Sequence, residues 1–138
     1  MNRILASSVV LVSILLLMGM GGMGGPAEVG KVPTPEKNFN VRVTDREGVQ
    51  TTLSQFSQEG KVSLIGKRGD ATVTIPFEKV SQIQFETLGG KDVQAKVSLR
   101  GQEAANVNVE KMAKFYGKAD FGTFEIAAKD LKSINFLP

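Results

Sequence analysis

The chain contains no cysteine, no histidine and no tryptophan, and it has a single tyrosine. The missing cysteine and histidine exclude Ser-His-Asp and Cys-His catalysis, haem attachment through a C-x-x-C-H motif, and zinc sites built on imidazole or thiolate. They also exclude a disulfide framework, so a folded domain must be stabilised by its core alone. With no tryptophan and one tyrosine, the chain has little to offer a flat carbohydrate site, which uses exposed aromatic rings.

The excess of positive charge is small and dispersed. The sequence has 17 lysine and arginine residues against 14 aspartate and glutamate residues, a formal net charge of +3. A nucleic-acid-binding protein gathers its positive charge into a patch. The sequence therefore predicts no nucleic-acid partner.

The N-terminal segment has the order of a secretory signal peptide. Arg3 provides a positive start, residues 4–20 are almost wholly apolar, and a glycine-rich stretch follows at residues 21–25. A small-x-small site at Gly25-Pro26-Ala27 predicts cleavage after Ala27, and Gly22-Met23-Gly24 is a competing site. The prediction is a signal peptide over residues 1–27.

An uncleaved anchor is the alternative for this segment. The apolar run lies near the short end of the roughly 17–25 residues that span a bilayer, so residues 4–20 could hold the protein to the inner membrane. In both cases the remaining chain is expected outside the cytoplasm, because Arg3 is the only early charge and stays inside. Contact with a membrane is expected only through an uncleaved N-terminus.

The mature chain is predicted to be an extended linker followed by an all-β domain. Residues 28–38 contain two spaced prolines and little apolar content, which is typical of a linker. From Phe39 onward apolar and polar residues alternate with a period of two, and turn-forming segments separate the runs, which predicts antiparallel strands with one buried face. Helical spacing is limited to one-turn pieces at Pro76–Lys79 and Ala128–Asp130.

The chain also contains an internal repeat. Leu64–Phe85 aligns without a gap with Phe115–Phe136, at an offset of 51 residues. Self-similarity at such a period indicates a supersecondary unit that is used twice. The aligned pairs include Gly66 with Gly117, Lys67 with Lys118, Thr72 with Thr123, Ile75 with Ile126, Ile83 with Ile134, and Phe85 with Phe136.

The repeat divides the all-β domain, residues 39–138, into copies of about five strands each, at residues 39–87 and 92–137. Their front halves align after a short gap, Val43-Thr44 with Val97-Ser98. A barrel of about 45 residues would be marginal by itself, and four residues make a short link. We therefore expect one shared sandwich or barrel core, with tandem small barrels as the alternative, and burial of both Ile-x-Phe ends.

The pattern of the copies resembles the small SH3-like and Sm-like β-barrels. The resemblance implies five strands with a helical turn before the last one. It implies no functional residues, because the chain has no ring-forming or RNA-reading motif and no aromatic-lined peptide groove. The residues that carry it are Val41-x-Val43, Gly48, Leu64, Val73-x-Ile75 and Ile83-x-Phe85, with their partners in the second copy.

Several short motifs invite a functional reading, and each has a simpler explanation. Asp45 and Glu47 beside Gly48 suggest a calcium loop, but Arg46 stands among them and a hairpin turn suffices. Arg68-Gly69-Asp70 matches an adhesion tripeptide and equally a hairpin turn. Residues 114–118 interleave lysines with aromatic rings, as single-strand binders do, but Phe115 falls on the inward alternation. We predict no catalytic, cofactor-binding or metal-binding residues.

Two recurring pairs receive structural interpretations. Lys67 and Lys118 are interpreted as guards against edge-to-edge pairing on edge strands, with a ligand-binding role as the alternative. Gly66 and Gly117 interrupt good strand sequence at equivalent places, which predicts a bulge, a tight bend or the close approach of another strand.

The function predicted from these observations is an exported, non-catalytic binding or structural module of the periplasm or envelope. Its partner would be an unknown protein or envelope component, and no cofactor is expected. The alternatives are a hydrolase that uses two carboxylates and a membrane-anchored envelope protein.

Overall fold

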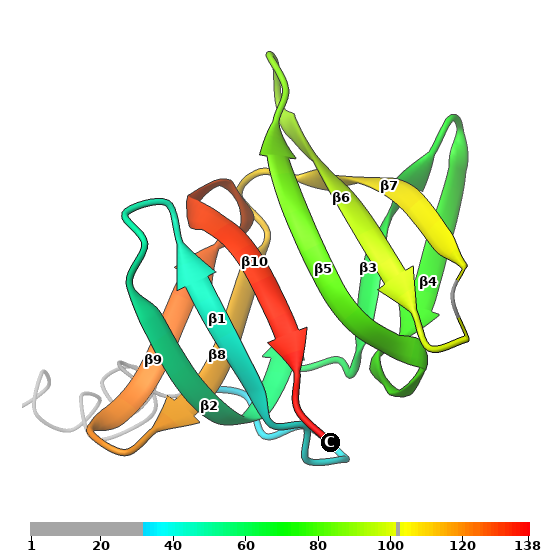
Figure 1. Ribbon diagram of the computed structural model, residues 1–138. Coiled ribbons are helices and arrows are strands. Elements are labelled where there is room, and N and C mark those ends of the chain that lie inside the picture. The colour runs from blue at the N-terminus through cyan, green and yellow to red at the C-terminus, as the bar shows by residue number, and fades with distance from the viewer. Residues whose placement is uncertain (1–31, 102) are drawn as a thin grey trace, which may run out of the picture. The chain divides into compact units, whose positions relative to one another are not determined.

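The computed structural model describes residues 32–101 and 103–138, and residues Val32–Pro138 form one compact unit. The predicted signal peptide and residues 28–31 of the predicted linker lie outside the described residues. The unit is all-β, as expected, with ten strands and two short 3-10 turns (Figure 1). In chain order these are β1 (Val41–Asp45), β2 (Gln50–Gln58), β3 (Ser63–Arg68), β4 (Ala71–Pro76), η2 (Phe77–Lys79), β5 (Val80–Thr87), β6 (Asp92–Leu99), β7 (Ala104–Glu110), β8 (Lys114–Ala119), β9 (Gly122–Ala127), η3 (Ala128–Asp130) and β10 (Leu131–Phe136).

The strands form one continuous, curled antiparallel sheet in the order β4-β3-β7-β6-β5-β10-β1-β2-β8-β9. The first repeat contributes β1–β5 and the second contributes β6–β10, which confirms five strands per copy. Exchanging each strand for its counterpart in the other repeat reproduces the same order read backwards. The sheet therefore has an internal pseudo-twofold axis.

The axis passes between Ile83 of β5 and Ile134 of β10, which lie directly opposite each other. These two residues are equivalent in the repeat. The flanking pairs, Gln82 with Asn135 and Gln84 with Ser133, exchange with each other under the same 51-residue offset. Register and sequence repeat thus describe the same symmetry.

The repeats exchange strands with each other. We call β5, β6, β7, β3 and β4 the first half-sheet, and β10, β1, β2, β8 and β9 the second half-sheet. In the first half-sheet β3–β5 of repeat one join β6–β7 of repeat two, and the second half-sheet has the reciprocal composition. Within residues 32–138 neither repeat forms a barrel of its own.

One hydrophobic cluster fills the curled sheet, and phenylalanine rings connect its two halves. Phe77 of η2, the turn between β4 and β5 of the first half-sheet, lies 5.0 Å from Phe136 of the second half-sheet, measured between ring centroids. Phe85 and Phe115 make a second such contact at 6.1 Å. The core is shared, and the predicted burial of Ile83, Phe85, Ile134 and Phe136 is confirmed.

Arginines at equivalent turns hold the two 3-10 turns. Arg46 donates its Nε to the Lys129 carbonyl at 3.5 Å and its backbone N–H to the Asp130 carbonyl at 3.0 Å. Arg100 makes the same two contacts to η2, at 3.2 and 2.9 Å. Each arginine therefore ties its own repeat to the other one, which stabilises the strand exchange.

The side chain of Gln58 makes the hydrogen bonds that a neighbouring strand would otherwise make to β3 near its start. Its side chain is 7% exposed, and its Nε2 donates to the Ile65 carbonyl at 3.2 Å while its Oε1 accepts from the Ile65 N–H at 2.9 Å. The amide thus satisfies both backbone groups of Ile65, which would otherwise be partly buried without partners.

Close approach of another strand, one of the three predicted reasons, explains Gly66 and Gly117. A Cβ on Gly66 would lie 2.5 Å from both the Asn108 carbonyl oxygen and a methyl group of Val107. A Cβ on Gly117 would lie 2.9 Å from the Cβ of Leu53, the counterpart of Val107. Both are closer than ordinary van der Waals contact, so the glycines allow β3 and β8 to cross their neighbours.

Candidate binding surface

A row of polar side chains crosses the outer face of the first half-sheet. Val107 and Val109 of β7 are buried, so Asn106 and Asn108 project from the opposite face. Asn108 lies opposite Lys67 of β3 on one side and opposite Gln94 of β6 on the other. The pairing therefore places an ammonium group and two amides from three adjacent strands next to one another.

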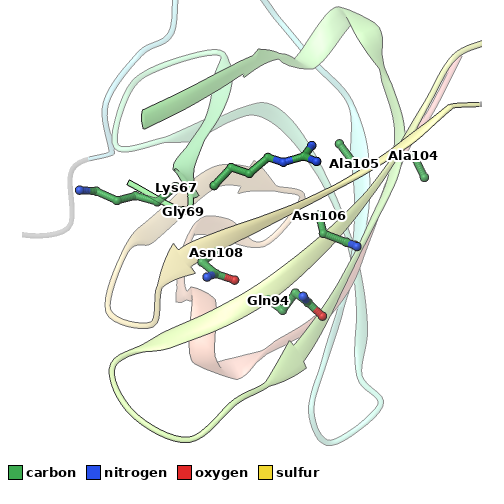
Figure 2. Close-up of a pocket in the computed structure, with 8 residues that line it drawn as sticks. Lys67, Gly69, Gln94, Ala104, Ala105, Asn106 and Asn108 are labelled. Atoms are coloured by element: carbon green, nitrogen blue, oxygen red, sulfur yellow. The ribbon is translucent and has the colours of Figure 1, made fainter. Parts of the chain in front are cut away.

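A hollow lies beside this row, between the end of β3 and the start of β7 (Figure 2). Ala104 and Ala105 are small, and the β3–β4 turn rises at the border with Arg68 and Gly69. The hollow has a volume of about 320 Å³. We call it the polar trough and define it by its lining residues, Lys67, Arg68, Gly69, Gln94, Ala104, Ala105, Asn106 and Asn108.

The polar groups of the trough are available to a ligand. Among the described residues, no hydrogen bond or ion pair uses the side chains of Lys67, Arg68, Gln94, Asn106 or Asn108. The lining has two cations and no carboxylate. The trough therefore offers amide donors and acceptors together with a local positive charge.

A second hollow of about 350 Å³ shares Lys67 and Asn108 with the trough, and it contains the carboxylates of this surface. They belong to Glu59, Asp92 and Glu110. The Glu59 Oε2 accepts a hydrogen bond from the backbone N–H of Lys114 at 3.2 Å, so this carboxylate already holds β8 in place.

The second half-sheet lacks an equivalent trough lining. Its β8 carries Lys118 at the place of Lys67, but Ser54 lies opposite Lys118 where Asn108 lies opposite Lys67. Ala119 replaces Arg68 in the aligned repeat. The pseudo-symmetric backbone thus presents two different surfaces, and Lys118 is an internal control for Lys67.

Two of the motifs considered in the sequence, at residues 45–48 and 114–118, have structural roles. Asp45 Oδ1 accepts backbone N–H bonds from Glu47 and Val49, both at 2.9 Å, which is the bonding of a turn. In the segment 114–118, Phe115 is fully buried. Lys114 in the same segment forms an ion pair with Glu125 at 3.1 Å.

The interpretation of Lys67 and Lys118 as edge guards is wrong. Both lie on inner strands, because β3 is flanked by β4 and β7, and β8 is flanked by β2 and β9. Strand exchange converts what reads as an edge within one repeat into the interior of the sheet. Lys67 instead lines the trough, and this surface was not predicted.

Sequence reasoning missed the amides of the trough. The available signal was the alternation Asn106-Val107-Asn108-Val109, which marks an amide-bearing outer face. The contribution of Gln94 and Lys67 could not be found, because it depends on which strands become neighbours of β7.

Two features are absent from residues 32–101 and 103–138. In this part of the chain, no group of three or more carboxylate, imidazole or thiolate side chains is arranged to hold a metal ion. The same residues include no helix of the length and apolar character required to cross a membrane.

Comparison with known families finds one family that matches the β domain. The sequence profile of a family whose description is "Uncharacterised protein" matches residues 35–137. The chain belongs to this family. The match covers all ten strands and both 3-10 turns. No curated protein and no solved structure matches the chain.

Proposed function

We propose that the protein is an exported, non-catalytic binding module of the cell envelope, and that its polar trough binds an anionic, hydroxyl-rich polymer. The observation that carries this proposal is the set of unpaired amide and cationic side chains in a lining without carboxylates. Amides donate and accept hydrogen bonds to hydroxyl groups, and Lys67 and Arg68 complement negative charge.

A polymer suits this surface better than a small ligand does. The trough is shallow and exposed, so each ionic contact contributes only about 0.2–1 kcal/mol. Several weak contacts to repeated groups on one chain add up through effective concentration. The second hollow adjoins the trough through Lys67 and Asn108, but its carboxylates would repel an anionic chain, so the polymer would lie along the trough itself.

Removing both cations is expected to weaken binding of polygalacturonate about tenfold, because two exposed ionic contacts together contribute about 1.4 kcal/mol. Affinity electrophoresis through gels that contain polygalacturonate, dextran or no polymer measures the effect for the Lys67→Ala/Arg68→Ala variant. Lys118→Ala is the matched control and should migrate as the unaltered protein does. Equal loss in both variants, or no retardation of the unaltered protein by polygalacturonate, would refute the proposed ligand class.

Hydrolysis is the competing function, and the same materials distinguish it. If the carboxylates of the second hollow cleaved the polymer, the protein would release oligosaccharides with new reducing ends. A non-catalytic module releases none during prolonged incubation. Release that disappears in an Asp92→Asn or Glu110→Gln variant would establish the hydrolase instead.

The proposed export predicts the residue at which the mature chain begins. We expect the protein outside the cytoplasm to begin near Glu28, because cleavage after Ala27 removes the charged start and the apolar run. The intact mass of protein recovered from the periplasmic or culture fraction measures this start. A mass that includes residues 4–20, found in the membrane fraction, would establish the anchored alternative.

A further inference from the structure

Strand β4 is an open edge of the sheet, with backbone groups that point away from the protein. The β3–β4 hairpin pairs Arg68 with Ala71 across a two-residue turn, which makes this a hydrogen-bonded pair. The alternation then directs the N–H and C=O groups of Thr72 and Thr74 outward, and both residues are exposed. Ile65 confirms this parity, because its groups face Gln58 on the side of β3 opposite to β4.

The two edges of the sheet differ in how they are protected. The opposite edge, β9, carries Glu125, which forms an ion pair with Lys114 at 3.1 Å. At the equivalent place β4 carries Thr74, and the whole strand, Ala-Thr-Val-Thr-Ile-Pro, has no charge. Charged side chains are the usual means of blocking an edge. Only Pro76 limits pairing on β4, at the end of the strand.

We propose that β4 pairs in an antiparallel fashion with β4 of a second copy of this chain, with the twofold axis between the two Val73 residues. Thr72 of each copy would lie opposite Thr74 of the other. The outward N–H and C=O groups of these threonines would then form four hydrogen bonds across the axis. Because the contact is isologous, it closes as a dimer while β9 remains guarded.

The chain already contains this form of self-pairing. At the internal axis, the triplet Gln82-Ile83-Gln84 pairs with Ser133-Ile134-Asn135, an aliphatic residue between two uncharged polar residues on each strand. Thr72-Val73-Thr74 has the same composition. At the pseudo-twofold axis, β5 and β10 join the two half-sheets into one antiparallel sheet. The proposed contact would join two copies of the chain in the same way, across a true twofold axis.

The dimer would also bring two troughs onto one surface. A twofold axis perpendicular to an antiparallel pair keeps the same face of both sheets on the same side. Lys67 and Arg68 are on β3, next to β4. This consequence would give bivalent polymer binding, but the strand pairing is independent of the proposed function.

The absence of cysteine from the chain allows a direct test of the register. In the proposed pair the two Val73 residues are directly opposite in a non-hydrogen-bonded position, with Cα atoms about 4.5 Å apart, which a disulfide spans. The full-length Val73→Cys variant should form a disulfide-linked dimer under mild oxidation. Ala71→Cys is the control and should remain monomeric, because its counterparts would be more than about 10 Å apart.

A second variant keeps the test independent of any effect of Val73→Cys on folding. The fraction of dimer is measured by sedimentation from about 10 μM to about 1 mM. Thr74→Lys should abolish concentration-dependent dimerisation, because it puts like charges across the axis, whereas Thr123→Lys on β9 should not. The proposal is overturned by an unaltered protein that stays monomeric throughout, by dimerisation that survives Thr74→Lys, or by equal cross-linking of both cysteine variants.

Discussion

Replacing Phe136 by alanine is expected to lower the free energy of unfolding by about 3–5 kcal/mol and to leave a single thermal transition. The ring is 7% exposed and lies 5.0, 5.9 and 6.3 Å from the rings of Phe77, Phe56 and Phe39, measured between centroids. Its loss leaves a cavity where the two half-sheets meet, and the surrounding backbone is held by strand pairing on both sides. Chemical denaturation measures the loss, and calorimetry counts the transitions.

Because the core is shared, substitutions of buried rings in either half-sheet should lower the free energy of unfolding of the whole domain. Phe85, the repeat counterpart of Phe136, is 3% exposed and contacts Phe115 of the other half-sheet, so Phe85→Ala should have a similar effect. Phe121 is 77% exposed, and Phe121→Ala should change the stability by less than about 0.5 kcal/mol. Two separate transitions, with only one of them shifted by Phe136→Ala, would contradict a single cooperative core.

Gly66→Val is expected to destabilise the protein by about 3 kcal/mol or more, at the upper end of the range for overpacking. Valine favours strands by its intrinsic propensity, so propensity alone predicts the opposite sign. The deciding fact is that the new Cβ would lie 2.5 Å from the Asn108 carbonyl oxygen, an atom of a neighbouring strand that cannot rotate away. The change in melting temperature and in the denaturation midpoint measures the cost.

Substitutions at two other glycines provide comparisons for the destabilisation expected of Gly66→Val. Gly117→Val should destabilise less than Gly66→Val, because its shortest contact, to the Leu53 Cβ, is 2.9 Å and its nearest backbone oxygen, of Ser54, is 3.2 Å away, against 2.5 Å for the Asn108 oxygen at Gly66. Gly89→Ala should be tolerated, because nothing lies within 4 Å of its added Cβ. An unchanged or raised melting temperature for Gly66→Val would show that β3 and β7 are not in close contact.

The order of local elements could be predicted from the sequence because local interactions determine it. Alternation indicated the strands, and the turn signals and the one-turn pieces at Phe77–Lys79 and Ala128–Asp130 appear in the structure. The repeat predicted two copies of five strands, equivalent glycines and buried Ile-x-Phe ends. Each of these features depends on residues close together in the chain or on the equivalence of two copies.

The partners of the strands could not be predicted in the same way. Alternation shows which face of a strand is buried, but it carries no information on which neighbour pairs with its edge. The repeat predicted a core shared by the two copies, but not that β3 pairs with β7 and β2 pairs with β8. The interpretation of Lys67 and Lys118 as edge residues is wrong because the exchange places β3 and β8 inside the sheet.

The sequence by itself determined an all-β chain with two equivalent copies, buried faces and glycines at equivalent places, because side-chain volume and the period of alternation act over a few residues. Only the tertiary structure decided that the copies exchange strands, that Gln94, Asn108 and Lys67 become neighbours, and that β4 is left open as an edge. The physical reason is that backbone hydrogen bonding is the same for every strand. Its partners are selected by long-range packing, here by the phenylalanine rings and the arginine contacts that connect the two repeats.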